Sequence, residues 1–144
     1  MFRSRVLHCA LLLVAIAANA HAKPAGTAVG VNQVARIVAG SKTGKMAVGQ
    51  GVFVGDKIAT TANGQVQIEF NDKTRLVIGP GSQLVIRDYV AAEQSRATSF
   101  TVSAIAGAFR FISGNSAKPS YKITTPTSTI GIRGTRFDFG VRSR

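Results

Sequence analysis

Apolar and polar residues alternate with a period of two along much of this chain. The clearest run is Gln65–Phe70, in which Val66, Ile68 and Phe70 alternate with glutamine and glutamate. Successive side chains of a β-strand point to opposite faces of a sheet. The pattern therefore predicts a strand that buries the three apolar residues and exposes the polar ones.

Turn-forming residues recur between the apolar runs at intervals of eight residues. Short strands between regularly spaced turns indicate an all-β fold. The regular interval favours the stacked coils of a solenoid, and an antiparallel, sandwich-like arrangement is a close alternative. The turns begin at Gly55-Asp56, Asn63-Gly64, Asn71-Asp72 and Gly79-Pro80-Gly81, and the predicted strands are Lys57–Thr61, Gln65–Phe70, Thr74–Ile78 and Gln83–Arg87.

The segment before these repeats has a weaker pattern. We interpret Lys23–Ala28 as a mobile leader and Val29–Val38 as a first strand, with Val34 and one of its last two apolar residues pointing inward. The basic stretch Gly40–Lys45 indicates a solvated hairpin loop. Its glycine spacing is one residue short of a phosphate-binding loop, so that function is disfavoured.

The segment after the repeats is predicted to contain more strands. Asp88–Ala97 interrupts the alternation, and we expect a loop or a single helical turn there. Apolar alternation resumes afterwards, with both phenylalanines of the Gly107–Ile112 segment on one face. The predicted strands are 99–105, 107–112, 121–124 and 137–141, with a turn at 114–120.

The first 22 residues have the pattern of a secretory signal peptide. Arg3 and Arg5 precede a largely apolar segment, Val6–Ala18, and Ala20-His21-Ala22 has the spacing of a cleavage site. The apolar segment is shorter than the roughly 20 residues of a membrane-spanning helix, which disfavours an uncleaved anchor. We therefore expect a periplasmic or secreted protein with no integral membrane span after cleavage. The expected organisation is a cleavable signal helix (1–22), a leader and first strand (23–47), and a single small β domain, solenoid-like or sandwich-like (48–144).

Cleavage would also remove several chemically important side chains. Both histidines, the single cysteine and two arginines lie within the first 22 residues. Without thiol or imidazole groups, the mature chain could have neither a Cys/His zinc site nor a histidine-activated nucleophile. Its few carboxylates are scattered, so no paired acids for hydrolysis are recognisable. We expect no catalytic residue, no metal and no cofactor.

The chain is strongly basic, with 18 Lys and Arg against 6 Asp and Glu and a formal charge of +12, which becomes +10 once the two signal-peptide arginines are lost. Such a charge suits an acidic partner, an anionic envelope glycan or a lipid surface. General solubility, with cations on outward strand positions, is the simpler explanation. Secretion argues against a nucleic-acid partner.

Thr125–Phe137 contains an unusual combination of residues. Pro126 is suited to an edge or the start of a strand. Gly131 and Gly134 flank an arginine, Arg133, which suggests a bulge or a close backbone approach. We interpret Arg133 as a structural clamp rather than a ligand contact, with Asp56 or Asp138 as its partner. Asp56 and Asp72 are interpreted as turn caps.

Five short motifs occur in a fixed order in the second part of the chain: Gly55-Asp56-Lys57-Ile58-Ala59-Thr60, Phe70-Asn71-Asp72-Lys73-Thr74-Arg75-Leu76, Gly107-Ala108-Phe109-Arg110-Phe111, Thr124-Thr125-Pro126 and Gly131-Ile132-Arg133-Gly134-Thr135-Arg136-Phe137. With these motifs, the chain from Val48 to Val141 resembles the FecR domain family. The resemblance implies a periplasmic or secreted, solenoid-like β domain. In the best-known members that domain receives a signal from an outer-membrane receptor and controls a sigma factor.

The cleavable apolar segment and the lack of a sigma-binding region before it differ from the regulator pattern. The expected function is therefore a non-enzymatic binding or interaction module with a protein partner in the cell envelope, linked to envelope sensing. The alternative is a structural envelope scaffold that binds anionic surfaces through its charge. The expected structural or interaction residues are Gly55, Asp56, Thr60, Gly107, Thr125, Pro126, Gly131, Arg133, Gly134, Thr135 and Phe137.

Overall fold

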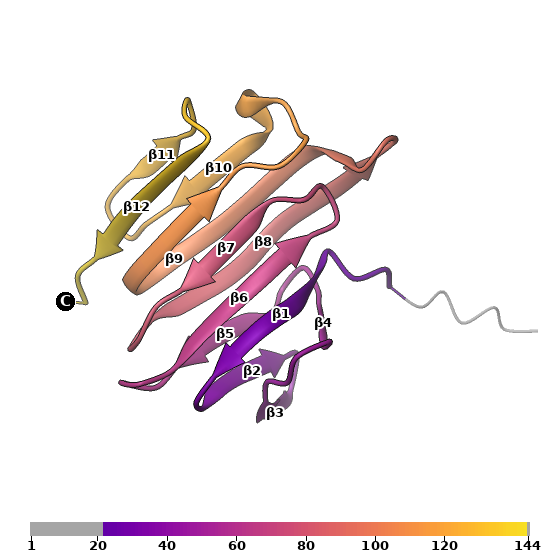
Figure 1. Cartoon of the computed structure of the whole chain (residues 1–144). Helices are drawn as coiled ribbons and strands as arrows, with labels where there is room; N and C mark the ends of the chain where they lie inside the picture. The colour runs from indigo at the N-terminus through magenta and orange to yellow at the C-terminus, as the bar shows by residue number, and fades with distance from the viewer. Residues whose placement is uncertain (1–21, 144) are drawn as a thin grey trace, which may run out of the picture.

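The computed structural model describes residues 22–143, so the predicted signal peptide, apart from Ala22, lies outside the described residues. The described part of the chain consists almost entirely of β-strands (Figure 1), which confirms the all-β fold class. No helix between residues 22 and 143 has the length and apolar character that a membrane crossing requires. The elements are β1 (Gly26–Asn32), β2 (Ala35–Ala39), β3 (Lys42–Lys45), β4 (Gly51–Val52), β5 (Lys57–Thr60), β6 (Gln65–Phe70), β7 (Arg75–Ile78), β8 (Gln83–Ala92), β9 (Arg96–Ile112), the one-turn 3-10 helix η1 (Lys118–Ser120), β10 (Tyr121–Thr124), β11 (Thr129–Gly131) and β12 (Arg136–Val141).

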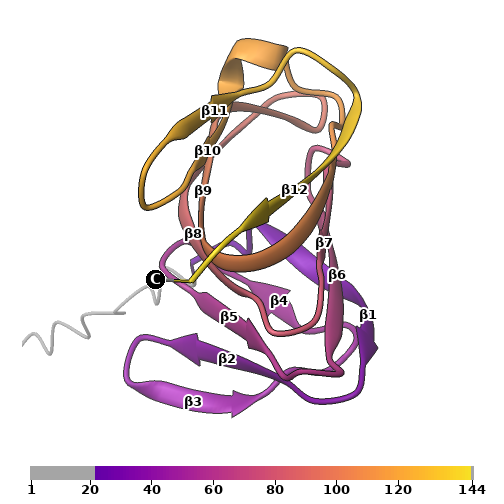
Figure 2. The same cartoon turned by 90° about the vertical axis from the view of Figure 1, so that its left-hand side faces the viewer.

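The strands form two sheets that face each other, as the edge-on view in Figure 2 shows. The first sheet has the order β4-β1-β6-β7-β9-β12, and the second has the order β3-β2-β5-β8-β9-β10-β11. Strand β9 belongs to both sheets. Its N-terminal part pairs with β8 and β10, and its C-terminal part pairs with β7 and β12. A single strand therefore joins the two layers.

Strand β9 passes from one sheet to the other at Gly107. This residue has φ +108°, a conformation that side chains rarely adopt. A Cβ atom at this position would overlap the side chain of Ser82. The hydroxyl of Ser82 accepts a hydrogen bond of 3.0 Å from the amide of Ala108, next to the bend. A glycine is therefore required at position 107, because of its positive φ angle and because Ser82 leaves no room for a side chain.

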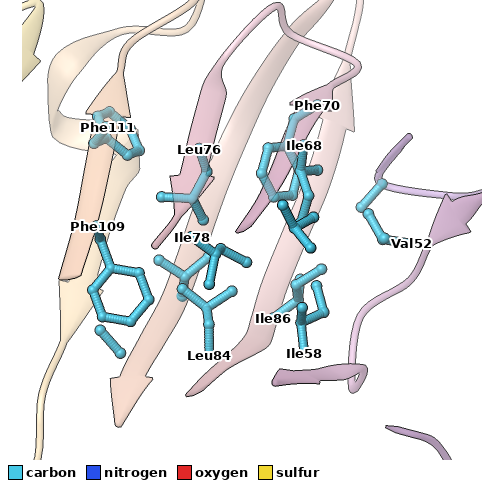
Figure 3. Close-up of a cluster of buried hydrophobic side chains, with 14 of the residues drawn as sticks. Val52, Ile58, Ile68, Phe70, Leu76, Ile78, Leu84, Ile86, Phe109 and Phe111 are labelled. Atoms are coloured by element: carbon cyan, nitrogen blue, oxygen red, sulfur yellow. The ribbon is translucent and has the colours of Figure 1, made fainter. Parts of the chain in front are cut away.

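The core lies between the two sheets and is filled by their alternating apolar side chains (Figure 3). The predicted alternation of β6 is confirmed, because Val66, Ile68 and Phe70 are buried. From the second sheet, Ile58 and Leu84 are also fully buried. Burial of apolar surface is the main stabilising contribution in such a sandwich.

Phe100 lies at the centre of an aromatic cluster within this core. Its ring centroid is 4.6 Å from that of Phe70, 5.6 Å from Tyr121, 5.7 Å from Tyr89 and 6.1 Å from Phe111. These pairs have the edge-to-face geometry that aromatic rings favour. The cluster joins residues of both sheets, so the ring of Phe100 holds the two layers together.

Of the two arrangements expected from the sequence, the sandwich-like one is observed. Every strand pair is antiparallel except β9 with β10. The regular turns reverse the chain instead of advancing it along a coil. At the β6–β7 turn, for example, Lys73 has φ +69° and its amide donates to the carbonyl of Phe70. A hairpin and a coil of equal length leave the same eight-residue interval in the sequence.

The predicted N-terminal elements were partly wrong. The single strand 29–38 is two strands, because the chain turns at Gln33, where φ is +59°. Val34 is 40% exposed at this turn and does not point inward, whereas Ile37 is buried as expected. The leader 23–28 was expected to be mobile, but Ala25 and Ala28 are buried, and β1 pairs with β6 and β4. The basic loop is a hairpin, with β3 as its exposed outer strand.

The prediction of a loop or helical turn at 88–97 was also wrong. Strand β8 continues to Ala92 and forms a hairpin with β9, closed by Gln94 and Ser95 in left-handed conformations. The two strands predicted at 99–105 and 107–112 are consecutive parts of β9. Residues 90–92 of β8, at the end of this hairpin, are exposed on both faces, so their sequence lacks the alternation by which strands are recognised.

Candidate interaction surface

Three of the predicted residues, Gly55, Asp56 and Thr60, stabilise turns inside the fold. The buried Asp56 carboxylate accepts a 2.9 Å hydrogen bond from the amide of Phe53, so it caps its turn as predicted. Burial raises the pKa of Asp56, and the hydrogen bond from Phe53 opposes this effect. Gly55, with φ +97°, supplies the left-handed residue of the same turn. The hydroxyl of Thr60 donates to the carbonyl of Gly79 at 2.6 Å, which ties β5 to the turn before β8.

Asp72 is fully buried and organises a hydrogen-bond network that the sequence did not reveal. Its Oδ2 atom accepts hydrogen bonds from the hydroxyls of Thr74 at 2.8 Å, Ser116 at 2.6 Å and Tyr121 at 2.9 Å. Its Oδ1 atom accepts from the amide of Thr74 at 3.1 Å, as expected of a turn cap. Hydrogen bonds to the charged form compensate a carboxylate for its burial. The network joins the β6–β7 turn to the loop before β10.

The hydroxyl of Tyr89 lies in the same region but has no hydrogen-bond partner among residues 22–143. The backbone of Asp72 approaches it without meeting hydrogen-bond geometry. Burial, followed by the negative charge of Asp72, raises the pKa of Tyr89 to about 12. An unpaired buried hydroxyl is a source of instability that a substitution can remove.

Tyr89→Phe should therefore leave the fold intact and raise the free energy of unfolding, by up to about 1 kcal/mol. It should also change the alkaline pH profile. Above pH 10 a tyrosine in the unfolded chain ionises while Tyr89 in the fold stays protonated, so stability falls as the pH rises towards 12. Denaturant unfolding between pH 8 and pH 11.5 should give a shallower decline for the variant. A lower stability of the variant at pH 8 would contradict the unpaired hydroxyl.

The C-terminal motif Thr125–Phe137 lies mainly on the surface. Thr125 holds a tight turn, because its hydroxyl accepts from the amide of Ser128 at 3.0 Å, and Pro126 is exposed in that turn. Gly131 and Gly134 are also exposed, and a Cβ atom on either would meet no neighbour within 4 Å. Neither has a positive φ angle. The predicted close backbone approach at these glycines is therefore wrong.

The clamp interpretation of Arg133 is also wrong. Its side chain is exposed and forms no ion pair within residues 22–143. Asp56 is buried against Phe53, and Asp138 forms a bidentate pair with Arg110 on the neighbouring strand, at 2.7 and 2.8 Å. The hydrogen bonds from Arg110 lower the pKa of Asp138. Both expected partners are thus engaged elsewhere, and the guanidinium of Arg133 faces solvent.

The remaining motif residues connect this surface to the core. The carbonyl of Thr135 accepts a 2.8 Å hydrogen bond from the amide of Ser113. The ring of Phe137 is only partly buried and stacks on Phe111 at 5.4 Å. Phe139 stacks on Phe109 in the same way, at 5.2 Å. Strand β12 is therefore attached by its backbone and by two stacked ring pairs.

Strands β11 and β12 form one flank of the sandwich, where each is the last strand of its sheet (Figure 1). We call this surface, with the Thr125–Ser128 turn and Arg133, the C-terminal flank. The half-buried apolar side chains of Ile130, Phe137 and Phe139 belong to it. An open pocket of about 810 Å³ lies between the Thr125–Ser128 turn, the end of β12 and the bend of β9.

No group of three or more His, Cys, Asp or Glu side chains that could bind a metal occurs within residues 22–143. The carboxylates of that segment either cap turns, accept from hydroxyls or pair with cations, apart from Glu93 in the exposed β8–β9 turn. The main feature of the surface is instead the C-terminal flank, where the outer edges of β11 and β12 have no strand partner among residues 22–143. This combination is typical of an all-β module that contacts other molecules through its surface.

Comparison with protein families identifies the group to which this module belongs. The family model described as FecR protein matches residues 56–144, more than half of the chain. The chain belongs to the FecR family, whose members are envelope-associated signalling regulators and are not known as enzymes. No curated protein and no solved structure gives a significant match.

Proposed function

We propose that this protein is a non-enzymatic, periplasmic or secreted interaction module that binds a protein partner of the cell envelope through the C-terminal flank. The predicted signal peptide supports an envelope location, and family membership links the chain to envelope signalling. Binding at this flank is the part of the proposal that rests on the geometry.

The observation that carries the proposal is the exposure of the family motif. Gly107 and Thr60 have clear roles inside the fold. Pro126, Gly131 and Arg133 are exposed, Gly131 contributes only backbone pairing of β11 with β10, and Arg133 forms no ion pair within residues 22–143. An exposed arginine with no acidic partner is well suited to recognise a carboxylate on another protein. Binding residues are found disproportionately on surface loops that a rigid scaffold positions.

The edge of β12 suggests how a partner binds. Its six residues pair with β9 on one side, and its other edge has no strand partner among residues 22–143. Unpaired backbone groups of an edge strand can bind an extended segment of another protein. Such a segment would also cover Phe137 and Phe139. Arg133, near the start of β12, would fix its direction through an acidic side chain.

Arg133→Ala tests this proposal, because the residue forms no ion pair within the described chain. The free energy of unfolding should change by less than about 0.5 kcal/mol, as for ordinary surface substitutions. In the native host, a photo-crosslinking amino acid at position 127, in the exposed Thr125–Ser128 turn of the flank, should capture one discrete envelope protein, and Arg133→Ala should weaken this capture. The same group at position 75, on the outer face of the first sheet, is the matched control.

Two results would contradict the proposal. Loss of stability in Arg133→Ala comparable to that of a core variant would restore a structural role for the arginine. Equal capture of the same proteins from positions 127 and 75 would show that the flank has no selectivity.

A further inference from the structure

The outer face of the second sheet carries cations from successive strands. Arg36 on β2 is directly opposite Lys45 on β3, and both side chains are exposed. Lys57 on β5 is in register with Val38, two residues along β2 from Arg36, so it is the diagonal neighbour of Arg36. Diagonal neighbours of this kind are about 7–8 Å apart.

The line of cations continues across the rest of the sheet. Val85 on β8 is in register with Lys57, and the exposed Arg87 lies two residues later, at the register shift between Ile86 and Asp88. Because its neighbour Ile86 is fully buried in the core, Arg87 belongs to the outer face. Beyond β9, Lys122 of β10 is exposed and in register with Thr101. We call these five residues, Lys45, Arg36, Lys57, Arg87 and Lys122, the cationic stripe. It crosses six adjacent strands diagonally, over a span of about 25 Å at the usual strand spacing.

The two outer faces of the sandwich differ in how their charges are compensated. On the first sheet, Lys73 and Arg75 both pair with Glu69 at 3.1 Å, and Arg110 pairs with Asp138. No member of the cationic stripe forms an ion pair within residues 22–143. One acid, Asp88, lies beside the stripe, and its carboxylate accepts the hydroxyl of Ser99.

This arrangement is unfavourable for the isolated protein. Like charges placed directly opposite each other, as in the Arg36–Lys45 pair, destabilise a sheet. A bound polyanion would remove this repulsion and gain electrostatic attraction from several cations at once. The stripe therefore has the properties of a binding surface for an acidic molecule, in contrast to the compensated face of the first sheet.

The shape and chemistry of the stripe favour a linear glycan. Its cations lie in single file, which suits a chain better than a flat bilayer. Several residues beside them are small or carry hydroxyl groups, among them Thr43, Ala59, Ser103 and Thr124. The two valines next to Lys57 do not protrude, because Val38 is half-buried and Val85 is buried. Hydroxyls can hydrogen-bond to sugars, whereas membrane surfaces favour protruding apolar side chains and single-stranded nucleic acids favour exposed aromatic rings.

We propose that the cationic stripe of the second sheet binds a linear acidic glycan, a sugar polymer with carboxylate, sulfate or phosphate groups. This inference is independent of the protein-partner proposal, because the stripe shares no residue with the C-terminal flank. It specifies a location and a ligand class for the anionic-surface function expected from the composition.

Binding to heparin, a sulfated and carboxylated glycan, tests this inference, with dextran as the neutral control. The wild-type protein should bind heparin but not dextran, and heparin should raise its melting temperature. The triple variant Arg36→Gln/Lys45→Gln/Lys57→Gln should bind about tenfold more weakly, as expected when several steering charges are lost. Lys73→Gln/Arg75→Gln/Arg110→Gln, with the same charge change on the first sheet, should lose less than about twofold.

Three outcomes would overturn the inference. Equal losses in the two triple variants would indicate attraction by net charge alone. Binding to phosphatidylglycerol vesicles but not to heparin would indicate a membrane surface instead. Tighter binding to a single-stranded oligonucleotide of equal charge would indicate a nucleic acid. If circular dichroism shows that the triple stripe variant is unfolded, Lys57→Gln alone is tested instead: weaker heparin binding supports the inference, and unchanged binding overturns it. Because Arg133→Ala leaves the stripe intact, it should bind heparin normally even if the protein-partner proposal fails.

Discussion

Phe100→Ala is expected to reduce the free energy of unfolding by about 3–5 kcal/mol, the usual cost of removing a large buried aromatic side chain. Phe100 is 1% exposed and packs edge-to-face against Phe70, Tyr89, Phe111 and Tyr121. Neighbours fixed in two sheets cannot easily collapse into the space left by the ring. Denaturant or thermal unfolding followed by circular dichroism measures the loss.

Two control variants separate this effect from a general effect of mutation. Phe139→Ala removes the same ring from the half-buried flank and should cost clearly less than Phe100→Ala. Gln67→Ala, on the outward-facing side of β6, should change stability by less than about 0.5 kcal/mol. Similar losses for Phe100→Ala and Phe139→Ala would mean that Phe100 does not hold the sheets together.

Asp72→Asn is expected to cost about 2–4 kcal/mol, although it changes the side-chain volume little, because buried donors lose their acceptor. Three hydroxyls donate to the single Oδ2 atom of Asp72. An asparagine NH₂ group at that position is itself a donor, and the other orientation would place it against the amide of Thr74. Either orientation leaves at least one buried donor unsatisfied.

Asp88→Asn is the matched control for this substitution. Asp88 is only half-buried and accepts a single side-chain hydrogen bond, from Ser99, so its substitution should cost no more than about 1 kcal/mol. The loop before β10 should also become more accessible to protease in Asp72→Asn, because Ser116 and Tyr121 lose their anchor. Equal stability of Asp72→Asn and wild type would mean that the network contributes nothing.

The strands that were predicted correctly from the sequence are those with one buried and one exposed face. The bounds of β6 are correct, and β5 and β7 differ from their predicted bounds by one residue. The end of the β8–β9 hairpin was missed because residues 90–92 of β8 are exposed on both faces. The eight-residue interval predicted turns correctly, but hairpins and coils share it. Period-two alternation reports a buried face, not the direction of the neighbouring strand.

The candidate surface was less predictable than the fold. The exposure of Arg133 depends on register: β12 places Asp138 opposite Arg110, and this pairing is not apparent from sequence spacing. The Asp72 network joins residues more than 40 positions apart, and nothing near Ser116 or Tyr121 signals a shared acceptor. The Asp72 and Thr74 pair in one turn was the only local indication. Sequence patterns thus identify turn residues but not their distant partners.

Strand β9 has a consequence for how the molecule unfolds. Its 17 residues supply backbone hydrogen bonds to both sheets, on either side of the bend at Gly107. Detaching β9 from one sheet would expose the core face of the other, so neither layer can open fully by itself. Local openings of proteins usually follow contiguous cooperative units. In this protein both layers therefore belong to one cooperative unit, and its boundaries do not coincide with those of either sheet.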